Sequence, residues 1–84
     1  MKYQIVWTPR AEAALTRIWL ASSDRNAVTA SASYFDDYLP KLPLYMGDAL
    51  ESSVHRVVRW PPLIVEYSVI EDDKRVVVNA VFAV

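Results

Sequence analysis

One short segment of the chain, from His55 to Arg59, gathers the side chains best suited to chemistry. An imidazole has an ordinary pKa of about 6.5, so His55 can give or take a proton near neutral pH. Arg56 and Arg59 carry permanent positive charges, and guanidinium groups bind phosphate or carboxylate oxygens through paired hydrogen bonds. The three side chains form either a site for an anionic group or a set of solvated surface charges.

Two aromatic residues follow this basic segment. Trp60 lies directly before Pro61 and Pro62, at the end of an expected strand. There it can stack on a base or on a protein partner, or it can anchor a hairpin. Tyr67 falls on the expected core face of the next strand, where its ring packs and its hydroxyl needs a hydrogen-bond partner.

Length and composition limit the kinds of protein that this chain can be. Its 84 residues predict one domain, 1–84, with a single hydrophobic core, and a hydrophobic content of 54% is enough to build that core. The chain has no Cys, which excludes disulfides and thiolate zinc sites, and its single His argues against a histidine-built metal site. We therefore expect no metal and no cofactor. A net charge of −1 gives no general attraction to polyanions.

Targeting and membrane signals are not evident in the sequence. It has no N-terminal apolar run with a cleavage site, and no stretch of about eighteen apolar residues. We therefore expect a soluble cytoplasmic protein with no membrane partner.

The first half of the chain predicts a strand followed by two helices. A strand is expected from Tyr3 to Trp7, and Thr8 with Pro9 is typical of a helix N-cap and first helical position. An apolar stripe then recurs at three- and four-residue steps, at Ala11, Ala14, Leu15, Ile18, Trp19 and Ser22. Asp24 is a suitable N-cap for a second helix over 25–39, which Pro40 and Pro43 end.

The second half predicts a turn and three antiparallel strands. The only glycine, Gly47, is expected at a turn with positive φ. The strands are expected over 54–60, 63–70 and 75–83, where β-branched and aromatic residues dominate. The residues expected to face the helices are Leu63, Val65, Tyr67 and Val69, then Val76, Val78, Ala80, Phe82 and Val84. The predicted fold is α+β, in the order β-α-α-β-β-β, with a two-helix hairpin on one face of a mainly antiparallel four-stranded sheet.

The other face of this sheet is the expected place for function, because two helices cover only one side. Alternation puts Gln4, Glu66, Ser68 and Asn79 there, together with the apolar residues Ile64, Val77 and Val81. This is more apolar surface than a solvated sheet needs. Either a partner covers it, or the chain's own tail or a second copy in a homodimer does.

Arg56 presents a problem of orientation. With Val54 and Val58 facing inward, strict alternation points Arg56 inward as well. Either a bulge turns it back toward the open face, or it is a structural cation paired with Asp48 or Glu51 near the edge of the sheet.

The order of these features resembles the RelE/ParE superfamily of bacterial toxins, which includes plasmid-stabilisation proteins. The resemblance spans nearly the whole chain. It rests on the opening strand with Thr8-Pro9-Arg10-Ala11-Glu12, on Leu15, Ile18 and Trp19, on Leu39, Pro43 and Gly47, and on Arg56 and Pro62-Leu63-Ile64-Val65-Glu66-Tyr67. The resemblance implies a toxin of a type II toxin–antitoxin pair, silenced by an antitoxin whose extended tail covers the active face. The residues expected to bind the antitoxin or the target are Arg56, Arg59, Trp60, Ile64, Val77 and Val81.

The superfamily is divided in its chemistry. RelE-like members cleave mRNA on the ribosome, whereas ParE-like members poison DNA gyrase, and fold alone does not separate them. Ile64 stands where RelE-like members carry an Arg, and no Tyr or His follows the last strand here. We therefore expect a ParE-like toxin that binds a macromolecule, and not a ribonuclease. The alternatives are a RelE-like endoribonuclease with His55, Arg56, Arg59 and Glu51 as catalytic residues, and a degenerate member that only binds its antitoxin.

Overall fold

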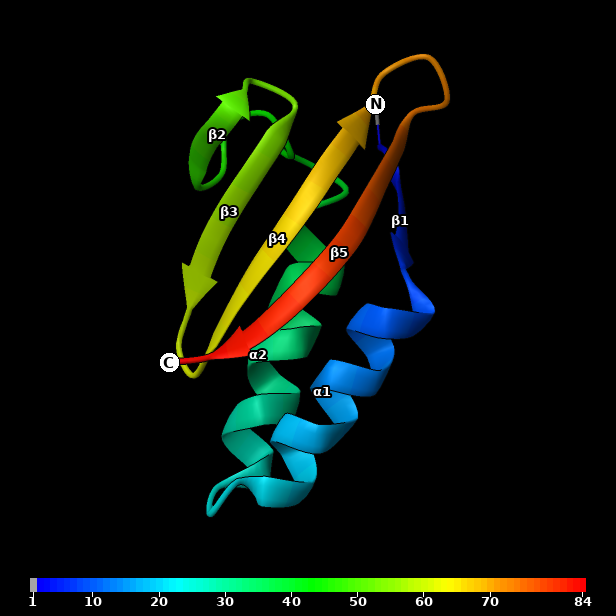
Figure 1. Ribbon diagram of the computed structural model, residues 1–84. Helices are drawn as coiled ribbons and strands as arrows, with labels where there is room; N and C mark the ends of the chain where they lie inside the picture. The colour runs from blue at the N-terminus through cyan, green and yellow to red at the C-terminus, as the bar shows by residue number, and fades with distance from the viewer. Residues whose placement is uncertain (1) are drawn as a thin grey trace.

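The structure is a computed structural model that describes residues 2–84. Two helices pack on one face of a single sheet (Figure 1). In chain order the elements are β1 (Gln4–Trp7), α1 (Pro9–Ala21), α2 (Arg25–Tyr38), β2 (Asp48–Ser52), β3 (His55–Trp60), β4 (Leu63–Ile70) and β5 (Arg75–Ala83). In Figure 1, α2 passes behind β4 and β5, with α1 beside it, so the opposite face of the sheet is turned toward the viewer.

Helix α1 begins where the sequence predicts. The Thr8 hydroxyl accepts a hydrogen bond from the backbone N–H of Ala11 at 3.1 Å, and Pro9 occupies the first helical position. The Thr8 hydroxyl thus satisfies one of the free backbone N–H groups of the first turn. Pro9 has no N–H, so it leaves no unpaired donor at its position. The chain therefore changes from strand to helix within two residues of Trp7.

A polar turn joins the two helices. Asp24 caps α2 by accepting from the N–H of Ala27 at 3.1 Å, as predicted. The Arg25 guanidinium donates to the carbonyls of Trp19 and Leu20 at 3.1 and 3.0 Å, so it satisfies two acceptors at the end of α1. Side chains of the turn thus satisfy free backbone groups both at the end of α1 and at the start of α2.

The sheet has five strands in the order β1-β5-β4-β3-β2. Strand β1 pairs parallel with the first half of β5, from Gln4 opposite Arg75 to Trp7 opposite Val78. The other neighbours pair antiparallel. The mainly antiparallel sheet and the two-helix layer on one face agree with the prediction.

The prediction of four strands is wrong, because β2 adds a fifth strand next to β3. All five of its residues are exposed, so no alternation of apolar and polar residues marks it in the sequence. Strand β2 begins at Asp48, directly after the predicted turn at Gly47, and Glu51 lies within it. Gly47 itself has φ +64°, as its position predicts.

The core lies between the helices and the inner face of β4 and β5. The predicted inward residues of β4, namely Leu63, Val65, Tyr67 and Val69, are all buried. They pack with Ala11 of α1 and with Val28, Phe35 and Leu39 from α2 and its C-cap. The regular alternation of β4 thus identified one side of the core correctly.

A β-bulge overturns the prediction for the second half of β5. Glu66 pairs with Ala80 and Tyr67 with Val78, so Asn79 is an extra residue in β5. The extra residue reverses which side chains face the helices. Val81 is therefore in the core, where the residue is only 4% exposed, and not on the open face. Ala80 is half-buried, while Phe82 and Val84, which were expected inside, are exposed.

Candidate functional site

The face of the sheet opposite the helices is the candidate site, and strand pairing arranges its side chains in cross-strand rows. One row, of Val77, Ser68 and His55, lies next to a second row of Ala80, Glu66 and Val57. A third row holds Phe82, Ile64 and Arg59. Asn79, the bulge residue, donates from Nδ2 to Ser68 Oγ at 2.9 Å. The open face therefore has a polar centre and an apolar end at Phe82 and Ile64.

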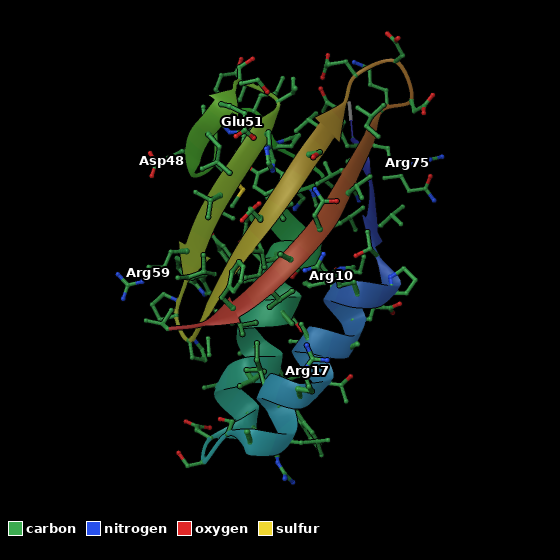
Figure 2. The ribbon with its side chains drawn as sticks, viewed as in Figure 1. Arg10, Arg17, Asp48, Glu51, Arg59 and Arg75 are labelled. Atoms are coloured by element: carbon green, nitrogen blue, oxygen red, sulfur yellow. The ribbon has the colours of Figure 1, made fainter. Side chains whose placement is uncertain are left out.

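His55 lies between two carboxylates on this face. Its Nδ1 contacts Glu51 Oε1 from β2, and its Nε2 is 3.3 Å from Glu66 Oε1 on β4. Figure 2 shows Glu51 at the end of β2 that adjoins β3, whereas Asp48 points away from the sheet. The hydrogen bond with Glu51 is the main cause that raises the pKa of His55, opposed by desolvation and reinforced by the charges of Glu51 and Glu66. The cluster can therefore hold a proton near neutral pH.

We expect NMR titration of the His55 ring to give a pKa above the ordinary value of about 6.5. Glu51→Gln should return this pKa toward that value, because it removes the first cause of the shift. Since the folded-state pKa is raised, the stabilisation from this contact is fully present below the unfolded pKa. It is lost as the pH rises through the folded pKa. Glu12→Gln, on α1, is the control, and a ring pKa at or below 6.5 would contradict the assignment.

Arg56 points toward the helix side, opposite Tyr67 in the sheet. Its guanidinium donates to three backbone carbonyls, those of Met46 at 3.0 Å, Ser53 at 3.0 Å and Gly47 at 3.2 Å. The inward direction follows the alternation, but the partners are carbonyls and not the predicted carboxylates of Asp48 or Glu51. Arg56 thus holds the segment between α2 and β3 in place.

Tyr67 contributes to the same attachment. Its ring is fully buried, and its hydroxyl lies 2.7 Å from the Pro43 carbonyl and 2.9 Å from the Met46 carbonyl. The Met46 carbonyl therefore meets both Tyr67 and Arg56. Burial raises the pKa of Tyr67, and its interaction with Arg56 opposes the rise. The predicted core role of Tyr67 agrees with this geometry.

Arg59 and Trp60 end strand β3. Arg59 is exposed, and Figure 2 shows it pointing away from the sheet. The Trp60 ring stacks on Tyr34 of α2 with 3.9 Å between ring centroids and 7° between planes, while the Trp60 carbonyl accepts from the Ser31 hydroxyl. Trp60 is thus attached to α2 and still 46% exposed.

The predicted catalytic residues come together only in part. Glu51 and His55 are in contact, and Arg59 shares their face four residues further along β3, about 13 Å away at the rise of a strand. Arg56 lies on the other face. Of the predicted binding residues, Ile64 and Val77 are half-buried on the open face, where Ile64 lies opposite Arg59 and Val77 lies opposite Ser68.

Three residues that the sequence did not single out border the candidate face. Arg10 and Arg17 of α1 and Phe82 of β5 line a groove of about 230 Å³, together with Ala14, Ala80 and Val81. The seven-residue spacing of the two arginines, which places them on one helix face, is visible in the sequence. The bulge that brings Phe82 beside them is not.

Within residues 2–84, no three His, Asp or Glu side chains are arranged to hold a metal ion, and no helix is long and apolar enough to cross a membrane.

No family model matches the sequence, and no curated protein matches it significantly. The structure is similar to a chain of the toxin–antitoxin complex RelBE2 from Mycobacterium tuberculosis, with a TM-score of 0.80. The two chains are 20% identical, and the match covers 100% of each. The chain has the RelE/ParE toxin fold. In this RelE/ParE fold, the candidate face carries Glu51, His55 and Arg59, while Arg56 supports the segment beneath it.

Proposed function

We propose that the protein is the toxin of a type II toxin–antitoxin pair and acts in the ParE-like manner, by binding a macromolecular target such as DNA gyrase. The placement of its cations is the observation that carries this proposal. Arg56 is engaged with backbone carbonyls on the helix side, and Arg59 lies far along the open face from His55. Cleavage of RNA needs a base, an acid and cations around one phosphate. The separation of these groups favours binding over cleavage.

The proposed partner is a cognate antitoxin that covers the open face. The similarity to a chain of a toxin–antitoxin complex supports such a partner. Ile64 and Val77 offer apolar contact there, and Arg59 offers a charge for a carboxylate. Arg56 and Val81 contribute from beneath the surface, by holding β3 and β5 in position. Trp60 offers the exposed part of its ring at the end of β3.

One observation favours the second candidate, a RelE-like ribosome-dependent mRNA endoribonuclease. His55 and Glu51 form a contact pair of acid and base groups on the open face. In that function Glu51 would accept the proton of a 2′-hydroxyl, His55 would protonate the leaving oxygen, and Arg59 would contact the phosphate.

Induced expression of the chain alone in bacteria tests the two functions. Growth, chromosome morphology and transcript ends by primer extension are followed in parallel. Filamentation with intact transcripts is the result expected for a gyrase-type toxin. New cuts within translated codons would establish the ribonuclease instead. No effect on growth would indicate a degenerate protein that only binds its antitoxin.

The antitoxin contact is tested with two open-face substitutions in the complex with the co-expressed neighbouring gene product. We expect Arg59→Ala to weaken binding about tenfold, the loss of one desolvated charge contact at the edge of an interface. Ile64→Ser should weaken it at least as much, because it removes apolar contact from the apolar end of the face. Leu20→Ser, an exposed apolar position on α1, is the control. Unchanged affinity in both open-face variants would exclude this surface as the interface.

A further inference from the structure

A groove runs between α1 and α2, which lie side by side in Figure 1, and we call it the helix groove. It has two adjoining parts, with volumes of about 270 and 250 Å³. The residues that line both parts are Leu15, Thr16, Ala32 and Asp36. Sites for small molecules usually measure about 300–1,000 Å³, so the two parts together can hold a small ligand.

One end of the helix groove is acidic. Glu12 of α1 and Asp36 of α2 line it there, and both are exposed. Among residues 2–84, neither carboxylate forms an ion pair, and neither part of the groove is lined by a Lys, Arg or His. This end therefore carries negative charge that the chain itself does not neutralise.

Trp7 lies beside these carboxylates and lines the same part of the groove. Its indole N–H donates to Asp36 Oδ1 at 2.7 Å, which holds the carboxylate next to the ring. A carboxylate accepts several hydrogen bonds, so Asp36 can also accept from a ligand. The face of an indole ring attracts cations as well. The acidic end is therefore suited to a cation that donates hydrogen bonds.

The other end of the helix groove is apolar. The apolar residues that line this part are Leu15, Trp19, Val28 and Ala32. Val28 is only 1% exposed, whereas Trp19 is 37% exposed and offers part of its ring to a ligand. The Arg25 guanidinium lies 4.5 Å from the centroid of the Trp19 ring. Its positive charge disfavours a second cation here, so a ligand is expected to place its charge at the acidic end and its apolar group against Trp19.

The length of the helix groove sets the size of the ligand. Glu12 and Trp19 are seven residues apart on α1, so they share a face of the helix. Their positions are separated by about 10 Å along the helix axis. A ligand that contacts both ends needs a cation and an apolar group joined by a short chain.

We propose that the helix groove binds a small organic amine, with its ammonium group on Asp36 and Glu12 and its apolar group against Trp19. An alkylammonium group has an ordinary pKa of about 10.4, so it is charged at neutral pH. The two carboxylates repel an anion, and a metal ion would leave the apolar end without a contact. The inference is independent of the proposed function, because it concerns the helices and not the open face of the sheet.

Titration of 4-phenylbutylamine into the whole ¹⁵N-labelled protein at pH 7 tests the site. We expect binding with a Kd on the order of 1 mM, as for other ligands of this size. The three tryptophans provide separate indole N–H signals. Those of Trp7 and Trp19 should shift, whereas the signal of Trp60, which stacks on Tyr34 outside the helix groove, should not.

Two related compounds separate the contribution of the charge from that of the ring. 4-Phenyl-1-butanol has the same shape without the charge, and it should bind about fivefold more weakly, as expected for exposed charge pairs. Butylamine lacks the ring, and it should bind at least about tenfold more weakly because less apolar surface is buried. Equal affinity for the amine and the alcohol would overturn the proposal.

A double variant tests the two carboxylates. Glu12→Gln, Asp36→Asn removes the charge and keeps the shape, so the amine should bind about fivefold more weakly and the alcohol as before. Asp37→Asn is the matched control, because Asp37 is an exposed acid on α2 that does not line the helix groove. It should change the affinity less than twofold. An unchanged amide spectrum outside the groove shows that the variants are folded.

Other results would overturn the proposal. They are the absence of binding, shifts at Trp60 in place of Trp7 and Trp19, and unchanged affinity in the double variant. Shifts of the groove amides that depend on protein concentration alone would assign the groove to a second copy of the chain. Tighter binding of a capped lysine peptide would assign it to a protein partner. Either of these last two results would overturn the choice of a free amine.

Discussion

Replacing Gly47 by alanine is expected to lower the free energy of unfolding by about 4 kcal/mol, as the sum of left-handed backbone strain and overpacking. The residue has φ +64°, which side-chain-bearing residues adopt at a cost. A Cβ atom there would lie 2.1 Å from the Val57 carbonyl oxygen and 2.8 Å from Val58 Cβ. The first neighbour is backbone of strand β3, so relief of the clash would disturb the sheet. Urea unfolding followed by circular dichroism measures the loss.

The matched control for Gly47 is its exposed neighbour. Asp48→Ala should change the free energy of unfolding by less than about 0.5 kcal/mol, as at most surface positions. A loss of about 4 kcal/mol is a large part of the total stability of a small domain, which is about 5–15 kcal/mol. We therefore expect Gly47→Ala to unfold at a clearly lower urea concentration than Asp48→Ala. Equal unfolding midpoints for the two variants would contradict the close approach of Gly47 and β3.

Arg56→Ala is expected to lower the free energy of unfolding by about 2–3 kcal/mol, because hydrogen bonds from a charged donor are lost. The carbonyls of Met46, Gly47 and Ser53 all lose a donor, and the segment before β3 loses its attachment to the sheet. The measurement is the midpoint of urea unfolding, with the fluorescence of the tryptophans as the signal.

Arg59→Ala is the comparison for Arg56, on the same strand with an exposed side chain. It should change the free energy of unfolding by less than about 0.5 kcal/mol. If the two variants are equally stable, the structural role of Arg56 is wrong. If they differ as expected, a loss of toxicity in Arg56→Ala reflects the fold, whereas a loss in Arg59→Ala reflects a contact with the target or the antitoxin.

Most helices and strands could be predicted because local residue types mark them. Thr8 with Pro9 and Asp24 mark the helix starts, and regular alternation marks β4. Strand β2 could not be predicted in this way, because a strand with five exposed residues carries no pattern of burial. The close approach of Gly47, directly before β2, to the Val57 backbone of β3 is also seen only in the folded chain.

The face of each residue in β5 was harder to predict. Strict alternation assigns Val76 and Val78 correctly to the face that packs on the helices. The extra residue Asn79 then exchanges the two faces for the rest of the strand. No glycine or proline marks the bulge, so alternation alone assigned Val81 and Phe82 to the wrong faces. The same reversal brings Phe82 beside Arg10 and Arg17, which explains why the sequence did not indicate that groove.

The orientation of Arg56 followed from alternation, but its partners did not. Alternation predicts a face, whereas the carbonyls of Met46, Gly47 and Ser53 belong to a segment whose path no residue pattern describes. The contact of His55 with Glu51 and Glu66 was predicted only in part, because Glu51 was among the candidate catalytic residues and Glu66 was not. It joins three neighbouring strands, one of which was not expected to exist.

The parallel pairing of β1 with β5 also determines when the protein can reach its final form. Among residues 2–84, strand β1 pairs with β5 alone, at residues 75–78. Pairings between distant parts of a chain form late, because the closing of a long loop precedes any gain from the contact. During synthesis, β1 therefore has no strand to pair with in this sheet position until residues 75–78 have been made.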